Sequence, residues 1–237
     1  MSNVVFQRQE LKYLISYQDF NVILPIIKQH LLPDQFGFKT IQSLYLDTDD
    51  YRLIRNSIDK PFYKEKIRLR SYNLAIDKQV FLELKKKCDN VVFKRRIILN
   101  EEDAFSFFDS HKDLPDFQIA NEIKYFVKFY QDLKPKFLII YDRKAYYGNN
   151  SDLRITFDEN VRYRTNKLNL HTSLDGKQIP QLNNRIIMEI KSTQGLPSWL
   201  LKLLSDNKIY KTSFSKYGEA YKLEFNNIHK KEEIKIG

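Results

Sequence analysis

Charged and apolar side chains alternate along several β-like segments of this 237-residue chain. In KIRLRSY (66–72), the even-numbered residues are basic or aromatic, whereas Ile67 and Leu69 are apolar. Successive side chains of a β-strand point to opposite faces of the sheet, so this segment builds one basic face and one apolar face. The same alternation recurs in FLELKKK (81–87), YDRKA (141–145), LRITFD (153–158) and IMEIKS (187–192).

The charged face of any one of these segments is most often the face that points to solvent. The recurrence in five segments, with Arg and Lys ahead of the acids, instead favours strands that turn their basic faces towards a shared interior. The chain carries 40 Lys and Arg against 30 Asp and Glu, a net charge of +10. Such a surplus favours phosphate-rich partners, namely nucleotides, nucleic acid, polyphosphate or an anionic membrane, without choosing among them.

The chain has a single cysteine, Cys88, which excludes an internal disulfide and a cysteine-based zinc site. This cysteine usage is typical of a reducing cytoplasm. The first residues show no signal-peptide pattern, and the longest apolar runs, such as Phe137 to Tyr141, are too short to span a membrane. We therefore expect a cytoplasmic protein that reaches a membrane only through a partner. The oligomeric state stays open.

The strand-signal rules predict about eight strands. Their expected ranges are 4–13, 39–48, 62–73, 79–88, 91–99, 136–147, 152–165 and 185–193. Helical spacing or helix-start signals mark a segment from Ser16 to about Leu31, kinked or shortened at Pro25, and further helices after Asn100, between Pro115 and Pro135, and after Pro197. A short last helix is expected from Ser215 to Phe225.

Short connections between the predicted strands favour an antiparallel sheet. The predicted fold class is therefore α+β, an eight-stranded antiparallel β-barrel flanked by helices, with the charged faces inward. No linker divides the sequence, so we expect one domain over residues 1–228, followed by a disordered tail at 229–237.

Several familiar chemistries have no signature in this chain. Neither GxxxxGK[ST] nor GxGxxG occurs among its six glycines, and the four histidines show no metal-ligand spacing. Cationic strand faces remain suited to phosphoryl transfer, because Arg and Lys stabilise the charge on a transferring phosphoryl group. A divalent cation needs at least one carboxylate, and Glu189, at a strand centre, is the best candidate. An ion pair between Glu189 and an interior Arg is the alternative.

The ordered motifs resemble the polyphosphate polymerase domain of the vacuolar transporter chaperone (VTC) family, a relative of the CYTH-like triphosphate tunnel enzymes. They are ELKYLIS (10–16), SLYLDT (43–48), KIRLRSY, FLELKKK, FKRR (93–96), YDRKAY (141–146), LRITFDENVRYR (153–164), MEIK (188–191) and SFSKYGEAY (213–221). The resemblance implies transfer of the terminal phosphoryl group of ATP to a polyphosphate chain, with Mn²⁺ or Mg²⁺ as cofactor. ATP and inorganic polyphosphate are then the partners, and nucleic acid is not expected.

The resemblance also implies site residues by motif position. Those expected at the reaction centre are Lys12, Arg68, Arg70, Lys85, Arg143 and Lys216. Those expected to bind substrate are Lys94, Tyr141, Arg154, Lys191 and Ser215, and Glu189 is expected to hold the metal.

Two departures from the related enzymes bear on the activity. CYTH hydrolases open with Glu-x-Glu-x-Lys, but here Arg8 replaces the first Glu, leaving Glu10 and Lys12. One carboxylate fewer weakens two-metal activation of water and favours transfer over hydrolysis. Eukaryotic members also carry an SPX domain and a membrane segment, and we expect a stand-alone catalytic domain here. A tunnel triphosphatase and a non-catalytic module that binds polyphosphate or RNA stay open as alternatives.

Overall fold

The computed structural model describes residues 9–35, 37–72, 78–89, 91–110, 113–149 and 151–225. The chain forms two compact units, each assembled from separate stretches of sequence. Unit 1 comprises Met1–Thr40, Tyr141–Val161 and Pro180–Phe214, and unit 2 comprises Ile41–Ile140, Arg162–Ile179 and Ser215–Gly237. The predicted single domain stays a prediction, and the predicted tail at 229–237 lies outside the described residues.

Unit 1 is built on antiparallel strands in the order β11-β1-β10-β8-β7. These strands are β11 (Lys211–Thr212), β1 (Gln9–Ser16), β10 (Arg185–Ser192), β8 (Arg154–Arg164) and β7 (Lys134–Tyr147), and β7 also pairs with β2 (Leu32–Pro33). The register places Lys12 of β1 opposite Glu189 of β10, and Glu189 opposite Thr156 of β8. Polar residues from three strands therefore share one face.

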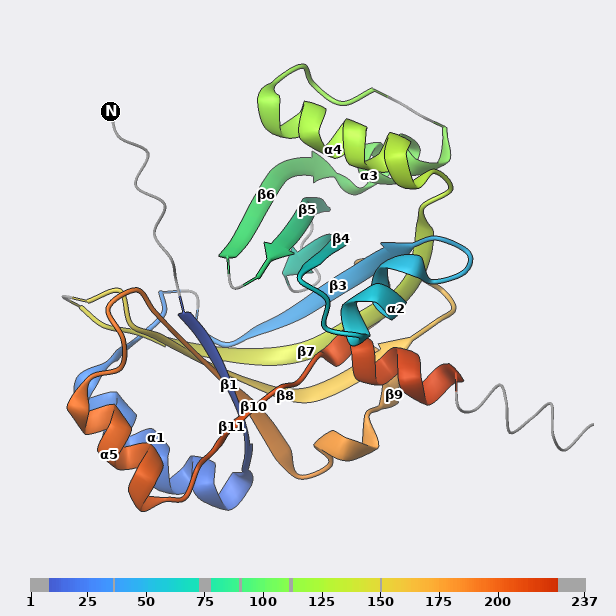
Figure 1. Cartoon of the computed structure of the whole chain (residues 1–237). Helices are drawn as coiled ribbons and strands as arrows, with labels where there is room; N and C mark the ends of the chain where they lie inside the picture. The colour runs from blue at the N-terminus through green and yellow to red at the C-terminus, as the bar shows by residue number, and fades with distance from the viewer. Residues whose placement is uncertain are drawn as a thin grey trace, which may run out of the picture. The chain divides into compact units, whose positions relative to one another are not determined.

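Helices α1 (Tyr17–His30) and α5 (Ser198–Asp206) cover the other face of the unit 1 strands (Figure 1). Helix α1 begins at a capping box in which Ser16 and Asp19 satisfy each other's backbone N–H groups. Pro25 lies inside α1, yet the helix continues to His30, so the predicted shortening is wrong. Burial of the apolar face, including Ile23 and Ile27, offsets the hydrogen bond that proline cannot donate. A single 3-10 turn, η1, spans Pro180–Leu182.

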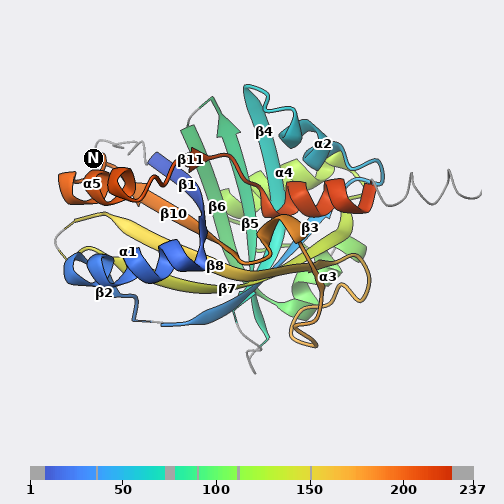
Figure 2. The same ribbon diagram turned by 90° about the horizontal axis from the view of Figure 1, so that it is seen from below.

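Unit 2 is built on the strand order β7-β3-β4-β5-β6. The further strands are β3 (Lys39–Asp47), β4 (Tyr63–Tyr72), β5 (Gln79–Cys88) and β6 (Val91–Asn100), with β9 (Lys177–Gln178) paired to β8. Figure 2 shows β4, β5 and β6 side by side. Arg68 of β4 lies opposite Glu83 of β5, which lies opposite Arg96 of β6. The charged residues of these three strands therefore form neighbouring rows.

The apolar rows of the same strands pack against helices α3 (Glu101–Asp109) and α4 (Gln118–Tyr130) (Figure 1). Leu69, Leu82 and Ile123 are among the fully buried residues of this second core. A helix over residues 216–225 ends the described chain. The charged rows of β4, β5 and β6 lie on the opposite face from this core, so they are left for another role.

Helix α2 (Arg52–Ile58) was not predicted from the sequence. Its start has no capping side chain of its own, and Tyr51 adopts a left-handed conformation there with φ of 58°. The buried carboxylate of Asp47 instead accepts hydrogen bonds from the backbone N–H groups of Leu53 and Ile54 at 2.8 and 3.0 Å. Because this cap is Asp47, at the end of β3, the residues at the start of α2 show no capping pattern in the sequence.

The predicted α+β fold with an antiparallel sheet and flanking helices is confirmed, and the eight long strands match the predicted ranges closely. Three two-residue strands raise the count to eleven in the described chain. The strand path is open, with β11 and β6 at its two ends, so the predicted closed eight-stranded barrel is wrong for the described residues. Closure requires hydrogen bonds between the terminal strands, and β11 offers only two residues. Strand β1 continues to Ser16, beyond the predicted end at residue 13.

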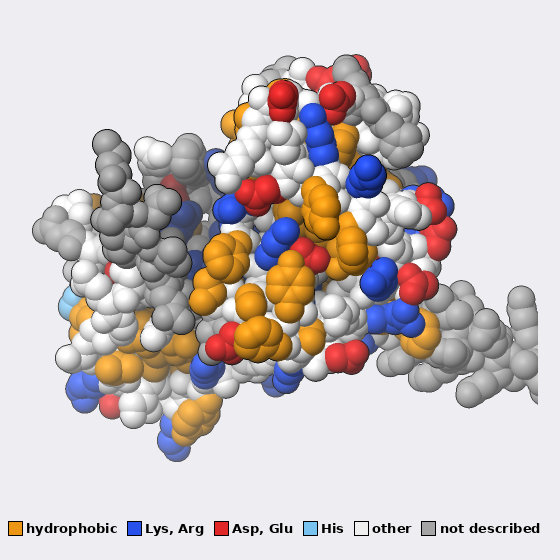
Figure 3. Space-filling model, turned by 45° about the horizontal axis from the view of Figure 1, so that its top comes forward, with side chains coloured by type: hydrophobic (Ala, Val, Ile, Leu, Met, Phe, Trp, Pro, Cys, Tyr) orange, Lys and Arg blue, Asp and Glu red, His pale blue; other side chains and the backbone are white. Residues whose placement is uncertain are grey.

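No described helix is both long and apolar enough to cross a membrane. Exposed aromatic side chains occur on unit 2, where Phe62 and Tyr125 each keep 70% of their surface exposed. Figure 3 shows hydrophobic, basic and acidic side chains mixed on the surface of this part of the molecule. The positive charge is therefore not spread as a continuous sheet over that surface.

Candidate functional site

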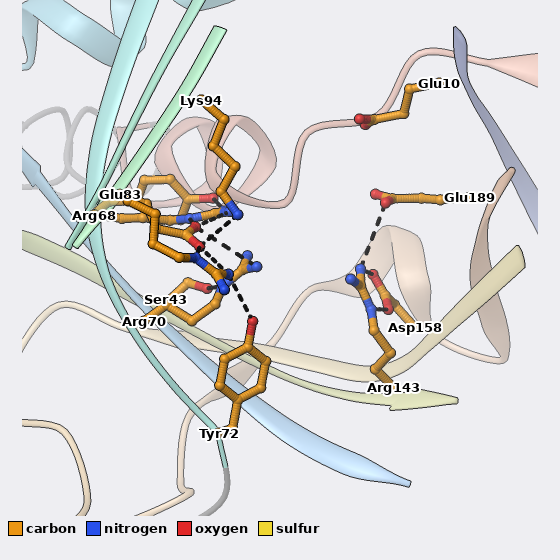
Figure 4. Close-up of polar contacts among 12 residues, drawn as sticks. Glu10, Ser43, Arg68, Arg70, Tyr72, Glu83, Lys94, Arg143, Asp158 and Glu189 are labelled. Atoms are coloured by element: carbon orange, nitrogen blue, oxygen red, sulfur yellow. Dashed lines mark hydrogen bonds and ion pairs between the residues drawn. The ribbon is translucent and has the colours of Figure 1, made fainter. Parts of the chain in front are cut away.

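In unit 2, four cationic side chains gather around the carboxylate of Glu83 (Figure 4). Arg68 donates to it through Nε at 2.9 Å and Nη2 at 2.7 Å, and Lys94 Nζ lies 2.8 Å away. Arg96 donates through Nε at 2.7 Å, and Arg70 Nη1 lies at 3.9 Å. We call these five residues the Glu83 cluster.

Glu83 is the buried centre of this cluster, with only 1% of its side chain exposed. Burial raises the pKa of Glu83, but Arg68, Arg70 and Lys94 outweigh burial and hold that pKa well below its ordinary value. Four cations against one carboxylate leave a net charge of +3. A carboxylate so placed fixes the positions of the cations without neutralising them.

Hydroxyl groups complete the surroundings of the three arginines. Ser43 accepts a hydrogen bond from Arg70 Nε at 3.3 Å, and the hydroxyls of Tyr45 and Tyr72 accept from Arg68 at 3.0 Å and Arg96 at 3.2 Å. Each guanidinium is thus held by at least two groups. Restricted cations lose little conformational freedom when they bind an anion, which favours affinity.

In unit 1, two carboxylates and two lysines alternate on the polar face of β1 and β10. Lys12 Nζ lies 3.4 Å from Glu10 and 3.4 Å from Glu189. Lys191 Nζ lies 3.6 Å from Glu10 and 3.8 Å from Glu189. We call these four residues, together with Arg143 and Asp158, the Glu189 cluster. These four lysine–glutamate contacts, at 3.4 to 3.8 Å, are longer than well-formed hydrogen bonds.

Arg143 of β7 joins the Glu189 cluster from a second side (Figure 4). Its Nε and Nη2 donate to the two oxygens of Asp158 at 2.5 and 2.7 Å, a two-pronged pair that fixes the guanidinium. Nη2 also lies 3.6 Å from Glu189. The guanidinium carbon stands 5.2 Å from the ring centre of Tyr141, so the buried tyrosine supports Arg143 from its ring face.

Lys12 keeps its charge in this setting. Burial lowers the pKa of Lys12, but Glu189 and Glu10 outweigh burial and raise that pKa above its ordinary value. Lys12 Nζ also lies 3.4 Å from the backbone oxygen of Phe214. A positive charge is therefore fixed between the two carboxylates.

The donor chemistry of Glu10 and Glu189 suits Mn²⁺ or Mg²⁺. Such ions take oxygen ligands and are commonly held by one or two carboxylates together with substrate phosphates. Both carboxylates already share the two lysine ammonium groups, so each can approach a common cation. Within the described ranges, no group of three or more His, Cys, Asp or Glu side chains could hold a metal. Glu10 and Glu189 therefore fit a metal that substrate oxygens help to bind.

Most of the predicted site residues fall into these two clusters. Arg68, Arg70 and Lys94 belong to the first, and Lys12, Lys191, Arg143 and Glu189 to the second. Arg154 pairs with Asp34 at 2.7 Å, outside both clusters, and its substrate-binding role stays a prediction. The register places Lys85 opposite Lys66 and Lys94, in the same polar rows as the Glu83 cluster.

Ser215 and Lys216 stand at the start of the helix over 216–225. The Ser215 hydroxyl accepts a hydrogen bond from the Gly218 N–H at 3.1 Å, which makes Ser215 a helix cap. Lys66 Nζ lies 3.4 Å from the same hydroxyl. Ser215 thus has a structural role beside the substrate-binding role predicted for it.

No site role is predicted from the sequence for Glu83, Arg96, Asp158 or Tyr45. Glu83 and Asp158 each lie on the polar row of a strand that also carries basic residues, and a carboxylate at such a position indicates a buried partner for arginine. Arg8, which replaces the first motif carboxylate, lies outside the described residues.

Comparison with protein families shows to which family the chain belongs. The VTC domain model matches residues 7–225, which is nearly the whole sequence. The chain belongs to the VTC domain family. The family predicted from the ordered motifs is thereby confirmed. A comparison with curated proteins finds no match.

The fold of this VTC domain resembles that of a candidate adenylate cyclase from Bacillus halodurans. The two are 14% identical, with a TM-score of 0.56, over 88% of this chain and 95% of that chain. The PH1819 protein of Pyrococcus horikoshii is also 14% identical, with a TM-score of 0.47 over 92% and 99%. A candidate adenylate cyclase from Vibrio parahaemolyticus is 11% identical, with a TM-score of 0.47 over 90% and 97%. At such identities, the first of these likenesses supports the fold alone.

Proposed function

We propose that this VTC domain is an ATP-dependent polyphosphate polymerase, which transfers the terminal phosphoryl group of ATP to a growing polyphosphate chain. The observation that carries the proposal is the Glu83 cluster, in which one buried carboxylate holds four cations on the polar face of β4, β5 and β6. Family membership supports polyphosphate or triphosphate as the substrate class.

Binding in this proposal depends on phosphate and not on base or sugar. Arg68, Arg70 and Arg96 present planar guanidinium groups, which can each donate to two phosphate oxygens. Lys94 adds a point charge that a ligand can reach, since 44% of its side chain is exposed. A polyphosphate chain repeats the same charged unit, so a row of fixed cations can hold it at any register.

Transfer in this proposal rests on charge stabilisation. The attacking group is a terminal phosphate oxygen, which is already anionic and needs no general base. Arg143, held by Asp158, and Lys12, held by Glu10 and Glu189, provide fixed positive charge for the transferring oxygens. Mn²⁺ or Mg²⁺, held by Glu189 and Glu10, would supply further charge neutralisation.

Hydrolysis is the runner-up reaction. A triphosphatase with the same clusters would transfer the phosphoryl group to water and release phosphate. Water needs activation, and Arg8 stands where the related hydrolases carry a first carboxylate. This substitution favours the polymerase. A module that binds polyphosphate without turnover is the third candidate, and the Glu83 cluster alone would suffice for it.

Product analysis separates the three functions. Purified protein is incubated with ATP and Mn²⁺, and the products are resolved by electrophoresis and by a phosphate assay. The polymerase is expected to give long polyphosphate with an equivalent amount of ADP. Phosphate release without polymer would establish the triphosphatase, and binding of polyphosphate with no change in ATP would leave the binding module.

A further inference from the structure

Tyr45 contacts the Glu83 cluster from β3, the strand beside β4. The register places Tyr45 directly opposite Arg68, and its hydroxyl accepts a hydrogen bond from Arg68 Nη1 at 3.0 Å. The guanidinium carbon of Arg68 lies 5.7 Å from the centre of the phenol ring. Among the described residues, no acceptor receives the proton of the Tyr45 hydroxyl. The hydroxyl is thus a donor with no acceptor beside a fixed cation.

The ring of Tyr45 is held from behind. Tyr217 stacks on it with ring centres 4.4 Å apart and planes inclined by 20°. The Tyr217 hydroxyl donates to the buried carboxylate of Asp47 at 3.0 Å, so it is committed to Asp47 and not to Tyr45. The phenol of Tyr45 therefore keeps its place beside Arg68 without using its own proton.

The charges around Tyr45 are mainly positive. Lys66, Arg68 and Arg70 face it from β4, with Glu83 of β5 behind Arg68. Tyr217 faces it from the helix over 216–225, and Asp47 lies behind Tyr217. Burial raises the pKa of Tyr45, but Arg68, Lys66 and Arg70 outweigh burial and lower that pKa to about 8.

We propose that Tyr45 is a further substrate-binding residue, whose neutral phenol donates a hydrogen bond to a phosphate oxygen and whose phenolate opposes phosphate binding. The inference rests on the proposed function insofar as the ligand is a phosphate chain. The proton lost on ionisation passes to solvent. The phenolate adds a negative charge next to Arg68, so the cluster loses part of the positive charge that attracts phosphate.

The ionisation of the Tyr45 phenol determines in which direction, and by how much, tripolyphosphate affinity changes with pH. Below pH 8, Tyr45 is mostly neutral and can donate, whereas at pH 9 about a tenth of it remains neutral. If only the neutral form binds, the dissociation constant for tripolyphosphate rises about tenfold between pH 7 and pH 9. Ionisation of the ligand itself also changes with pH, so the wild type has to be compared with a variant at each pH.

The test measures tripolyphosphate binding by calorimetry, without ATP, at pH 7 and pH 9. Wild type is compared with Tyr45→Phe, which keeps the stacked ring and removes the hydroxyl. The matched control is Tyr125→Phe, which removes a hydroxyl from a residue of unit 2 that is 70% exposed. At pH 7, Tyr45→Phe is expected to bind about fivefold more weakly than wild type, because one hydrogen bond is lost.

At pH 9, that difference is expected to vanish or reverse, whereas Tyr125→Phe follows wild type at both pH values. An absorbance titration at the tyrosinate band should show a group ionising near pH 8 in wild type and missing in Tyr45→Phe, which assigns this ionisation to Tyr45. An equal ratio of the two dissociation constants at pH 7 and pH 9 would overturn the inference, as would a lack of tripolyphosphate binding to wild type. Tripolyphosphate binding with the expected pH dependence, but no polymer formation from ATP, would support the role of Tyr45 and contradict the proposed polymerase activity.

Discussion

Glu83 in unit 2 and Glu189 in unit 1 are both buried carboxylates on a polar sheet face, yet their cations hold them differently. Glu83 has 1% of its side chain exposed, and Arg68, Lys94 and Arg96 bind it at hydrogen-bonding distances, including 2.7 and 2.8 Å. Glu189 has 8% exposed, and its cations lie 3.4 to 3.8 Å away.

The contact distances determine how firmly each carboxylate is held. Hydrogen bonds at 2.7 to 2.9 Å use the lone pairs of Glu83, so its oxygens are occupied and its cations are fixed. At more than 3.3 Å, a lysine ammonium contributes attraction but weak hydrogen bonding. The cations at 3.4 to 3.8 Å therefore hold Glu189 less tightly than the cations of the other cluster hold Glu83. In the proposed function, the Glu83 cluster holds phosphate and the Glu189 cluster takes part in turnover.

The largest expected effect comes from removing the charge that organises unit 2. Glu83→Gln keeps the shape of the side chain and leaves four cations without their carboxylate. We expect the free energy of unfolding to fall by about 3 kcal/mol, the cost of breaking a buried ion pair, discounted because Lys94 and Arg96 are partly exposed. Chemical denaturation at pH 7 measures this loss.

The pH dependence of the same variant isolates the contribution of the Glu83 charge to stability. The pKa of Glu83 is lowered in the folded state, so its stabilisation is fully present above the ordinary carboxyl pKa and is lost as the pH falls towards the folded value. The stability difference between wild type and Glu83→Gln should therefore shrink below about pH 4.5, the ordinary glutamate value. A constant difference from pH 7 to pH 3 would show that charge is not its cause.

A smaller effect is expected when one phosphate-binding arginine is removed. Arg70→Ala should weaken the binding of ATP, GTP and tripolyphosphate alike by about tenfold, because the lost contact is to phosphate and not to the base. Arg95→Ala is the matched control, since Arg95 pairs with Glu122 of α4 on the helix-covered side of the same strands. Equilibrium binding tests both variants, and a loss confined to one nucleotide would contradict a phosphate contact at Arg70.

The smallest expected effect is the loss of folding stability when Lys94, the most exposed cation of the Glu83 cluster, is replaced. Lys94→Met removes a partner of Glu83 that is 44% exposed. We expect a loss of under about 1 kcal/mol in the free energy of unfolding, as for other exposed ion pairs. Thermal or chemical unfolding provides the value, and a loss as large as that of Glu83→Gln would mean that a single lysine, and not the group of cations, holds the carboxylate.

The strands could be predicted from the sequence because the alternation of charged and apolar residues is a local property. Rows such as Arg68 and Arg70 against Ile67 and Leu69 predicted both the strand and its two faces, and the structure has them so. Closure of the sheet could not be predicted, because it depends on pairing between strands distant in the chain. Helix α2 was missed for a similar reason, since its cap comes from Asp47.

The candidate site was predictable as a set of cations but not as two clusters. Family resemblance pointed to Arg68, Arg70, Lys94, Arg143 and Glu189, yet it did not indicate which carboxylate each cation contacts. The pairing of Arg143 with Asp158 and of Arg96 with Glu83 depends on strand register, which a period-two pattern leaves undetermined. Arg154 pairs with Asp34, a contact that the sequence did not indicate, and its role in substrate binding stays a prediction.

The division between holding and turnover is tested most directly by Glu189→Gln. Tripolyphosphate affinity and polyphosphate formation from ATP and Mn²⁺ are measured on the same preparation, beside wild type. We predict a dissociation constant within about threefold of wild type and a rate at least about 100-fold lower, since a metal-binding carboxylate acts mainly in the transition state. Polymer formation at the wild-type rate would contradict the account.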